Sequence, residues 1–208
     1  TDQIRQEFLT IAEQLEGSMH PYLGRRQIDQ LTALLVSPKS TLAQRTQWSA
    51  QLTYHQLRLG RVQEASAAID AAMREYRARS AEPPIWLLKA QAMVYLRQAE
   101  MANCIQKHTP DCCLFPLANG GVHAEKKPAR QAFGLLKAIL EREPNDKLVQ
   151  WLLNIAAMAL GEFPQLVPEP YRIPPGVFTT KQGMARFVDV APARGLDAFN
   201  LCGGAAVA

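Results

Sequence analysis

Two stretches with apolar residues at helical spacing, Leu42 to Leu59 and Val62 to Tyr76, are separated only by the short turn Leu59-Gly60-Arg61. Helices joined by so tight a turn must lie antiparallel, because the chain reverses its direction within a few residues. The sequence therefore predicts a helical hairpin here. If the same unit recurs along the chain, it defines the fold of the whole helical part.

The residues around this turn resemble a tetratricopeptide-like repeat, whose helix-turn-helix unit recurs about every 34 residues. Ala65 falls at the small position where the paired helices cross closely. A second match runs from Ala129 to Asp146, with Ala132 at the small position and Pro144 closing the unit. The agreement of these positions favours a repeated hairpin.

Other segments extend the helical pattern. Leu148 to Leu160 follows in register and ends at Gly161, where a repeat turn is expected. Three more helices are predicted, from Ile4 to Leu15, from Arg25 to Leu35, and from Ile85 through Leu96. We predict an all-α array of about six to eight helices over residues 1–163, arranged as tetratricopeptide-like hairpins. Trp48, Trp86 and Trp151 lie within the apolar patterns, so we expect them to pack between helices.

Charge and hydropathy exclude two classes of partner. The net charge of +4 is spread evenly, with 12 basic and 10 acidic residues in 1–100 and 11 and 9 in 101–208. Nucleic-acid binding needs clustered Lys and Arg to neutralise phosphates, so we expect no nucleic acid. No apolar run reaches the roughly 20 residues of a membrane span, so none is predicted.

An insertion over residues 103–127 separates the helix that begins at Ile85 from its partner. A long segment without periodicity in a helical array is often functional. It holds five side chains that could form a disulfide or bind a metal: Cys104, His108, Cys112, Cys113 and His123.

The spacing of these side chains leaves several hypotheses open. Thiolate and imidazole are ligands for zinc or copper, yet the usual C-x₂₋₄-C and H-x₃₋₅-H pairs are absent. A disulfide from Cys104 to Cys112 or Cys113 would stabilise the insertion by ~2–4 kcal/mol. Unpaired thiols, and histidines that bond only to backbone, are the remaining alternatives. A catalytic Cys–His pair would also need an orienting group, and the sequence indicates no convincing one.

The amino-acid composition of the chain changes after Pro164. Five prolines between Pro164 and Pro175 exclude a helix and predict an extended linker over residues 164–184. Residues 185–190 alternate like a short strand, and small residues dominate the end of the chain. We therefore expect residues 185–208 to be the truncated start of a second domain, with an extended or β conformation.

Two motifs in this tail carry a family resemblance: Arg186 to Ala191 with Gly195-Leu196, and Gly203 to Ala208. In this order they resemble the opening of the ASPIC/UnbV family of FG-GAP/VCBS-repeat proteins, relatives of the cartilage acidic protein type. There, an F-x-D-V-A strand and a G-x-A-V-A segment precede an acidic calcium loop in the first blade of a β-propeller. The resemblance implies calcium only in that propeller, beyond Ala208.

Several bacterial members of the family are similar in carrying a tetratricopeptide-like region, with an insertion like residues 103–127, before the propeller. The resemblance implies an exported protein, periplasmic or extracellular, whose signal peptide is absent from this chain. It brings no known catalytic mechanism.

Helical repeat arrays commonly hold an extended peptide or a partner helix. We therefore predict a protein-binding or peptide-binding scaffold rather than an enzyme. The candidate groove residues are Gln47, Gln51, Tyr54 and Arg58 on the first helix of the clearest repeat. The partner is another protein, a peptide, or the chain's own C-terminal propeller. The alternative is a metal-binding or redox-active component of an enzyme that uses the insertion.

Overall fold

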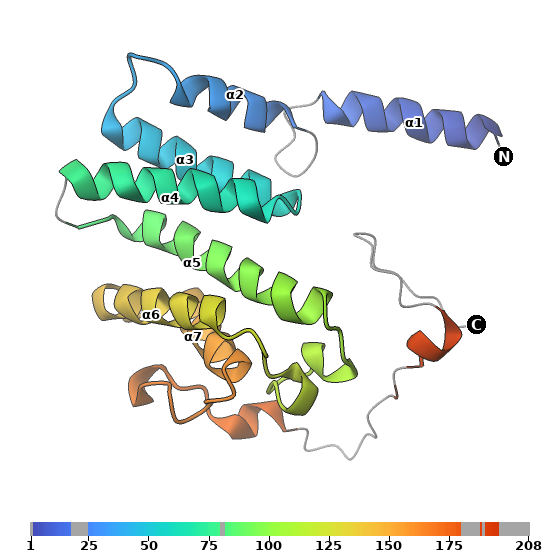
Figure 1. The fold of residues 1–208 in the computed structure, drawn as a ribbon, viewed down its shortest axis with the longest axis vertical. Helices are drawn as coiled ribbons and strands as arrows, with labels where there is room; N and C mark the ends of the chain where they lie inside the picture. The colour runs from blue at the N-terminus through green and yellow to red at the C-terminus, as the bar shows by residue number, and fades with distance from the viewer. Residues whose placement is uncertain (1, 18–24, 80–81, 180–187, 189, 196–208) are drawn as a thin grey trace.

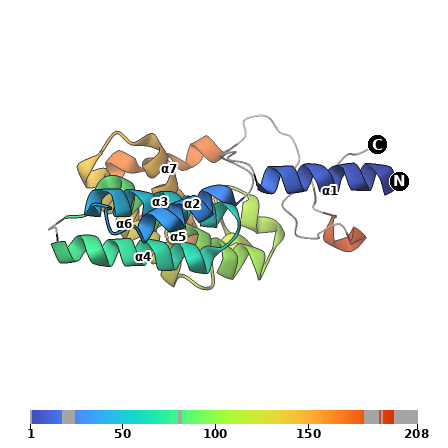
Figure 2. The same ribbon diagram turned by 90° about the horizontal axis from the view of Figure 1, so that it is seen from above.

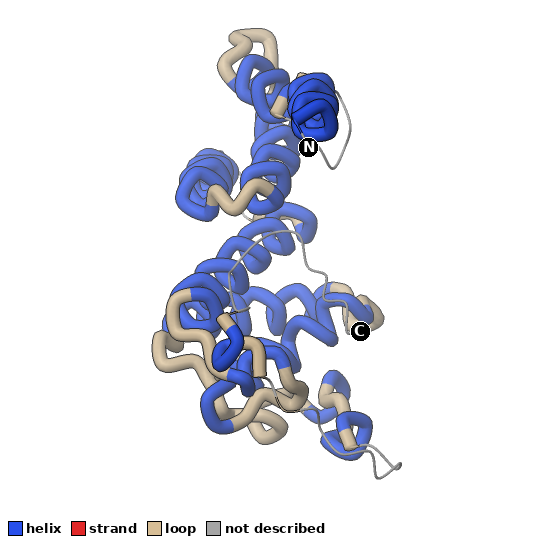
Figure 3. The backbone as a smooth tube through the Cα atoms, turned by 90° about the vertical axis from the view of Figure 1, so that its right-hand side faces the viewer, coloured by secondary structure: helices blue, strands red, loops and turns tan. Residues whose placement is uncertain are grey.

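The structure, a computed structural model, describes residues 2–17, 25–79, 82–179, 188 and 190–195. These residues form an all-α fold, as predicted, and no strand occurs among them (Figure 3). The α-helices are α1 (Asp2–Glu16), α2 (Arg26–Leu35), α3 (Leu42–Arg58), α4 (Val62–Arg79), α5 (Ile85–Glu100), α6 (Lys127–Arg142) and α7 (Lys147–Ala159). Short helical turns occupy the insertion and the segment after α7.

Helices α2 to α7 stack one upon another along the long axis of the molecule (Figure 1). α3 packs closely on α4, α5 on α6, and α6 on α7, and α3 also contacts α5. One continuous hydrophobic core runs through α3 to α7, where Ile69, Leu87, Leu136 and Leu153 are completely buried. A small separate cluster of Ile28, Leu31 and Leu52 attaches α2 to α3.

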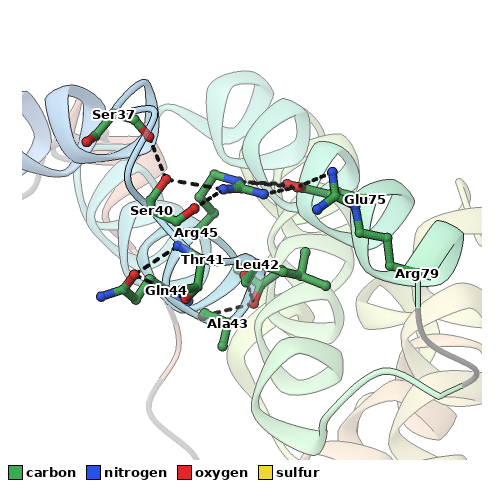
Figure 4. A network of polar contacts seen from close by, with 10 residues as sticks. Ser37, Ser40, Thr41, Leu42, Ala43, Gln44, Arg45, Glu75 and Arg79 are labelled. Carbon is green, nitrogen blue, oxygen red and sulfur yellow. Dashed lines mark hydrogen bonds and ion pairs between the residues drawn. The ribbon is translucent and has the colours of Figure 1, made fainter.

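The predicted hairpin of α3 and α4 is present, and polar contacts fix its entry. Thr41 caps α3 by accepting a hydrogen bond from the Gln44 backbone N–H at 3.2 Å, and the Gln44 side chain accepts one from the Thr41 N–H at 2.9 Å. Arg45 in α3 reaches Glu75 in α4 at 2.5 Å and Ser40 Oγ at 3.2 Å (Figure 4). This network ties the start of α3 to the far end of α4.

Gly60 and Gly161 end α3 and α7 in the same way. Both have φ of +72°, a left-handed conformation that glycine adopts without penalty. After α3, the Gly60 and Arg61 N–H groups donate to Leu57 and Gln56 carbonyls at 3.0 and 2.9 Å. After α7, the N–H groups of Gly161 and the residue after it donate in the same pattern, at 2.8 and 3.0 Å. Both ends are Schellman motifs, so the turn predicted at Gly161 is present.

The two turns lead into different structures. Gly60 leads into the long helix α4, whereas residues 162–179 fold back over α7 through two 3-10 helices, Glu169–Tyr171 and Pro175–Phe178. Asn154, completely buried in α7, donates to the Tyr171 carbonyl at 2.8 Å and accepts from the Ile173 N–H at 3.0 Å. The first part of the predicted linker is therefore bound to the helical array.

The predicted tail falls mostly outside the described residues, since 180–187, 189 and 196–208 are not among them. Within residues 188 and 190–195 the structure has a 3-10 helix, Pro192–Arg194, and no strand. The domain boundaries proposed for residues 164–184 and 185–208 remain predictions.

Helix α1 lies beside the stack rather than in it (Figure 2). It buries none of its residues against the described part of the chain, and its apolar stripe of Ile4, Phe8, Leu9 and Ile11 is 46 to 67% exposed. Over the described ranges, none of the helices has the length and apolar character that crossing a bilayer would require.

Candidate functional site

A surface groove lies where α3 and α5 run beside each other. Three of the four predicted groove residues, Gln47, Gln51 and Tyr54, line it from α3, and Trp86 and Lys89 line it from α5. The cavity measures about 490 Å³. Positions 47, 51 and 54 are neighbours on a helix surface, three or four residues apart, so one face of α3 presents them together.

The groove wall is mostly apolar, with a few polar side chains and no strong net charge. Lys89 Nζ lies 2.6 Å from Asp146 Oδ2 and 3.0 Å from Glu143 Oε2. The hydrogen bond to Asp146 is the main reason that the pKa of Lys89 is raised. The ammonium therefore stays charged, and the two carboxylates balance its charge. Burial raises the pKa of Tyr54, whose phenol therefore keeps its proton and can donate a hydrogen bond.

Sequence reasoning missed the two groove residues on α5 and included one residue that does not line the groove. Trp86 was expected to pack between helices, yet its side chain is 40% exposed in the groove. Lys89 carries no sequence signal, because its position depends on how α5 packs against α3. Arg58, at the end of α3, is not part of the lining.

The insertion is joined to the helices at both of its ends. α5 continues into a π-helical turn, Met101–Ile105, which carries Asn103 and Cys104. Buried Asn103 donates to the Glu125 carbonyl at 3.0 Å and accepts from the Glu125 N–H at 2.9 Å. The His123 N–H donates to the Ala159 carbonyl at 2.8 Å, which fixes the insertion against the end of α7.

The structure brings together only some of the five Cys and His residues. Cys104 Sγ lies 3.5 Å from His123 Nε2, and Cys112 is buried beside Cys104, close enough to affect its ionisation. His108 and Cys113 are exposed. In the described part of the chain, no three His, Cys, Asp or Glu side chains are grouped so that they could hold a metal ion. The thiols at 104, 112 and 113 are free there.

Burial sets the protonation of the Cys104–His123 pair. Burial, with a smaller contribution from Cys112, raises the pKa of the Cys104 thiol to about 11. Burial also lowers the pKa of His123, against a weaker opposing effect of Glu100. Both side chains are therefore neutral near pH 7, which differs from the thiolate that a reactive cysteine needs.

Comparison with protein-family models, curated proteins and solved structures finds no match to this chain. The functional conclusion therefore rests on the groove and on the insertion themselves.

Proposed function

We propose that residues 1–163 form a tetratricopeptide-like scaffold that binds an extended polypeptide segment in the groove between α3 and α5. The observation that carries the proposal is that Gln47, Gln51 and Tyr54 share one groove with Trp86 and Lys89, although two separate helices supply them. The matching turns at Gly60 and Gly161 support the repeat architecture.

The chemistry of the groove favours a peptide backbone as the ligand. The Gln47 and Gln51 amides can each donate and accept hydrogen bonds, as a peptide group does. Trp86 offers an exposed aromatic face for one apolar side chain. Since Lys89 is already compensated by Asp146 and Glu143, affinity should come from hydrogen bonds and apolar contact rather than from net charge.

The resemblance of the tail to ASPIC/UnbV proteins supports an exported location, periplasmic or extracellular, for this scaffold. The bound segment is then part of another exported protein. A segment of the chain's own C-terminal propeller is the other source that binding experiments should distinguish.

The test is selection of peptides from a random display library on the 208-residue chain, with measurement of Kd by fluorescence anisotropy. The double substitution Gln47→Ala and Gln51→Ala should weaken a selected peptide about tenfold or more, because two hydrogen bonds are lost. Trp86→Ala should weaken it further. Arg74→Ala, at an exposed position of α4 outside the groove, is the matched control and should leave Kd unchanged.

A selected peptide whose Kd is unchanged by all three groove substitutions would count against the proposal. A peptide copied from the propeller of the full-length protein, competing for the same groove, would identify an internal partner.

A further inference from the structure

Helix α1 carries an exposed line of apolar side chains with the spacing of a coiled coil. Ile4, Phe8, Ile11 and Leu15 follow one another at intervals of four, three and four residues, so they form one seam along the helix. Their side chains are 36 to 67% exposed. Leu9 lies outside this seam, and a single exposed apolar side chain is ordinary on a protein surface. The α1 seam is a surface of the kind on which a second helix packs.

The helix α1 gains little stability from the array. It has 15 residues and buries none of them against the described part of the chain. An isolated helix of about 15 residues is only marginally stable in water, and most helical stability in proteins comes from the packing of an apolar face. A second helix on the α1 seam would supply that packing.

The position of α1 leaves room for a second helix. The Arg25 N–H donates to the Glu16 carbonyl at 3.2 Å, and Arg26 Nη1 donates to the Gly17 carbonyl at 3.3 Å. These bonds join the C-terminal end of α1 to the start of α2, while the N-terminal end points away from the stack (Figure 1). A second helix can therefore lie along α1 without meeting the array.

The charges of α1 decide which partner fits the seam. The helix carries four acidic residues and one basic residue, whereas helices that lie on membranes carry Lys and Arg on their polar face. Helical spacing places Asp2, Glu13 and Glu16 away from the seam, and Arg5 and Glu7 are the charged residues that flank it. Two copies of α1 can therefore meet along the seam without bringing like charges together.

We propose that two copies of this chain form a dimer through antiparallel pairing of their α1 helices. In this register Ile4 faces Leu15 of the second copy, and Phe8 faces Ile11 of the second copy. Both contacts occur twice, because a two-fold interface uses the same surface on each copy. The seam is therefore complementary to itself.

Two features favour antiparallel over parallel pairing. Arg5 passes the small Ala12 of the second copy and extends toward Glu16 of that copy, so opposite charges approach each other. Because the N-terminal end of α1 points away from the stack, antiparallel pairing also places the two arrays at opposite ends of the helix pair (Figure 1). Parallel pairing would place both arrays at the same end, where they would compete for space.

Sedimentation velocity of the 208-residue chain over a dilution series tests the proposal. We expect a reversible dimer with twice the 23.1 kDa mass of one chain. Phe8→Glu and Ile11→Lys should each weaken dimerisation about a hundredfold or more, because two apolar contacts are lost and two unpaired charges are buried. Since α1 contributes nothing to the core of α3 to α7, both variants should keep the urea transition of the array.

A mixture of the two variants distinguishes antiparallel from parallel pairing. Only the antiparallel register brings the introduced carboxylate of one chain to the introduced ammonium of the other, while the second Phe8 and Ile11 contact is kept. The mixture should therefore dimerise about tenfold or more tightly than either variant alone. Gln6→Glu and Gln6→Lys, on the side of α1 opposite the seam, are the matched charge controls and should dimerise as the parent chain does.

The proposal is overturned if the chain stays monomeric up to about 1 mM, if both seam variants dimerise as the parent does, or if their mixture dimerises no better than either alone. A monomer that binds phospholipid vesicles through α1 would overturn it in favour of a membrane surface. A monomer whose α1 amides resist hydrogen exchange would overturn it in favour of α1 folding onto its own array. Because the peptide groove is not involved, none of these results bears on peptide binding.

Discussion

Asn154 Nδ2 donates a 2.8 Å hydrogen bond to the Tyr171 carbonyl, so one buried side chain of α7 holds the segment that comes after the helical array. Its Oδ1 accepts from the Ile173 N–H, and the Tyr171 hydroxyl donates to the Leu140 carbonyl in α6 at 3.0 Å. These bonds hold the segment after α7 against α6 and α7.

Asn154→Ala should therefore release this segment and lower the free energy of unfolding by about 1–3 kcal/mol, because buried backbone groups lose their partners. Urea denaturation measures the loss, and hydrogen exchange should show faster exchange of the Ile173 amide. Gln165→Ala, at an exposed position of the same segment, is the control. An unchanged Ile173 exchange rate in Asn154→Ala would contradict the assigned role.

Gly60 and Gly161 offer a matched pair of substitutions. Both have φ of +72°, so alanine is strained at either site, by about 1–2 kcal/mol. A methyl group at Gly60 would meet open space, whereas one at Gly161 would lie 2.9 Å from Val122 Cγ1 in the insertion. We expect Gly161→Ala to destabilise the chain more than Gly60→Ala, as measured by urea denaturation.

Adding Val122→Ala to Gly161→Ala should recover part of the difference, because the clashing methyl groups are removed. Equal effects of the two glycine substitutions would mean that the insertion moves aside at no cost.

Stability should fall as the pH drops from about 7.5 to 5. The pKa of His123 is lowered from 6.5 by burial, and the pKa of His55 is lowered by burial and then by Arg58. The unfolded chain therefore binds protons below pH 6.5 that the folded chain does not bind, which favours unfolding. The pKa values of the Glu75 and Asp146 carboxylates are also lowered, but these shifts change the stability only at more acidic pH.

Urea denaturation at a series of pH values checks this prediction. His123→Leu should show a shallower decline than the parent chain, and His55→Gln should retain the part due to His123. The same slope in the parent chain and in His123→Leu would refute the assignment to His123.

The three described cysteines should differ in reactivity. Cys113 is exposed, Cys112 is buried, and the pKa of the Cys104 thiol is raised to about 11. Under native conditions at about pH 8, iodoacetamide should label Cys113 first, and Cys104 and Cys112 only after unfolding, because the thiolate is the reactive form. Mass spectrometry of peptides gives the order.

The same experiment without reductant examines the predicted disulfide. Recovery of Cys104 linked to Cys112 or Cys113 would show that the thiols pair under oxidising conditions. Early labelling of Cys104 in the folded chain would contradict its raised pKa.

Local sequence signals were sufficient for the helices and their ends. Apolar spacing predicted α3 and α4 within three residues of their bounds, and glycine predicted the turns at Gly60 and Gly161 because only a residue without a side chain adopts that conformation freely. Three of the α3 residues that line the groove, Gln47, Gln51 and Tyr54, could be predicted because helical spacing places them on one face.

Features that depend on contacts distant in sequence could not be predicted. The exposure of Trp86 results from how α5 packs beside α3, and an apolar pattern alone does not reveal it. In the sequence, Asn154 is an ordinary polar residue in an apolar helix. Its role becomes visible only from its hydrogen bonds to residues 171 and 173. Likewise, Cys104 and His123 are 19 residues apart and meet only because both ends of the insertion are joined to helices.

The pair of hydrogen bonds between Asn103 and the backbone of Glu125 joins the two ends of the insertion at its base. Because α5 and α6 pack directly on each other, the helices do not depend on the insertion to set their spacing. The exposed part of this segment, around His108 and Cys113, can therefore vary in length and content while the array persists. Such a separable loop offers a place where proteins with this scaffold can diverge, and where a designer can graft a new binding element.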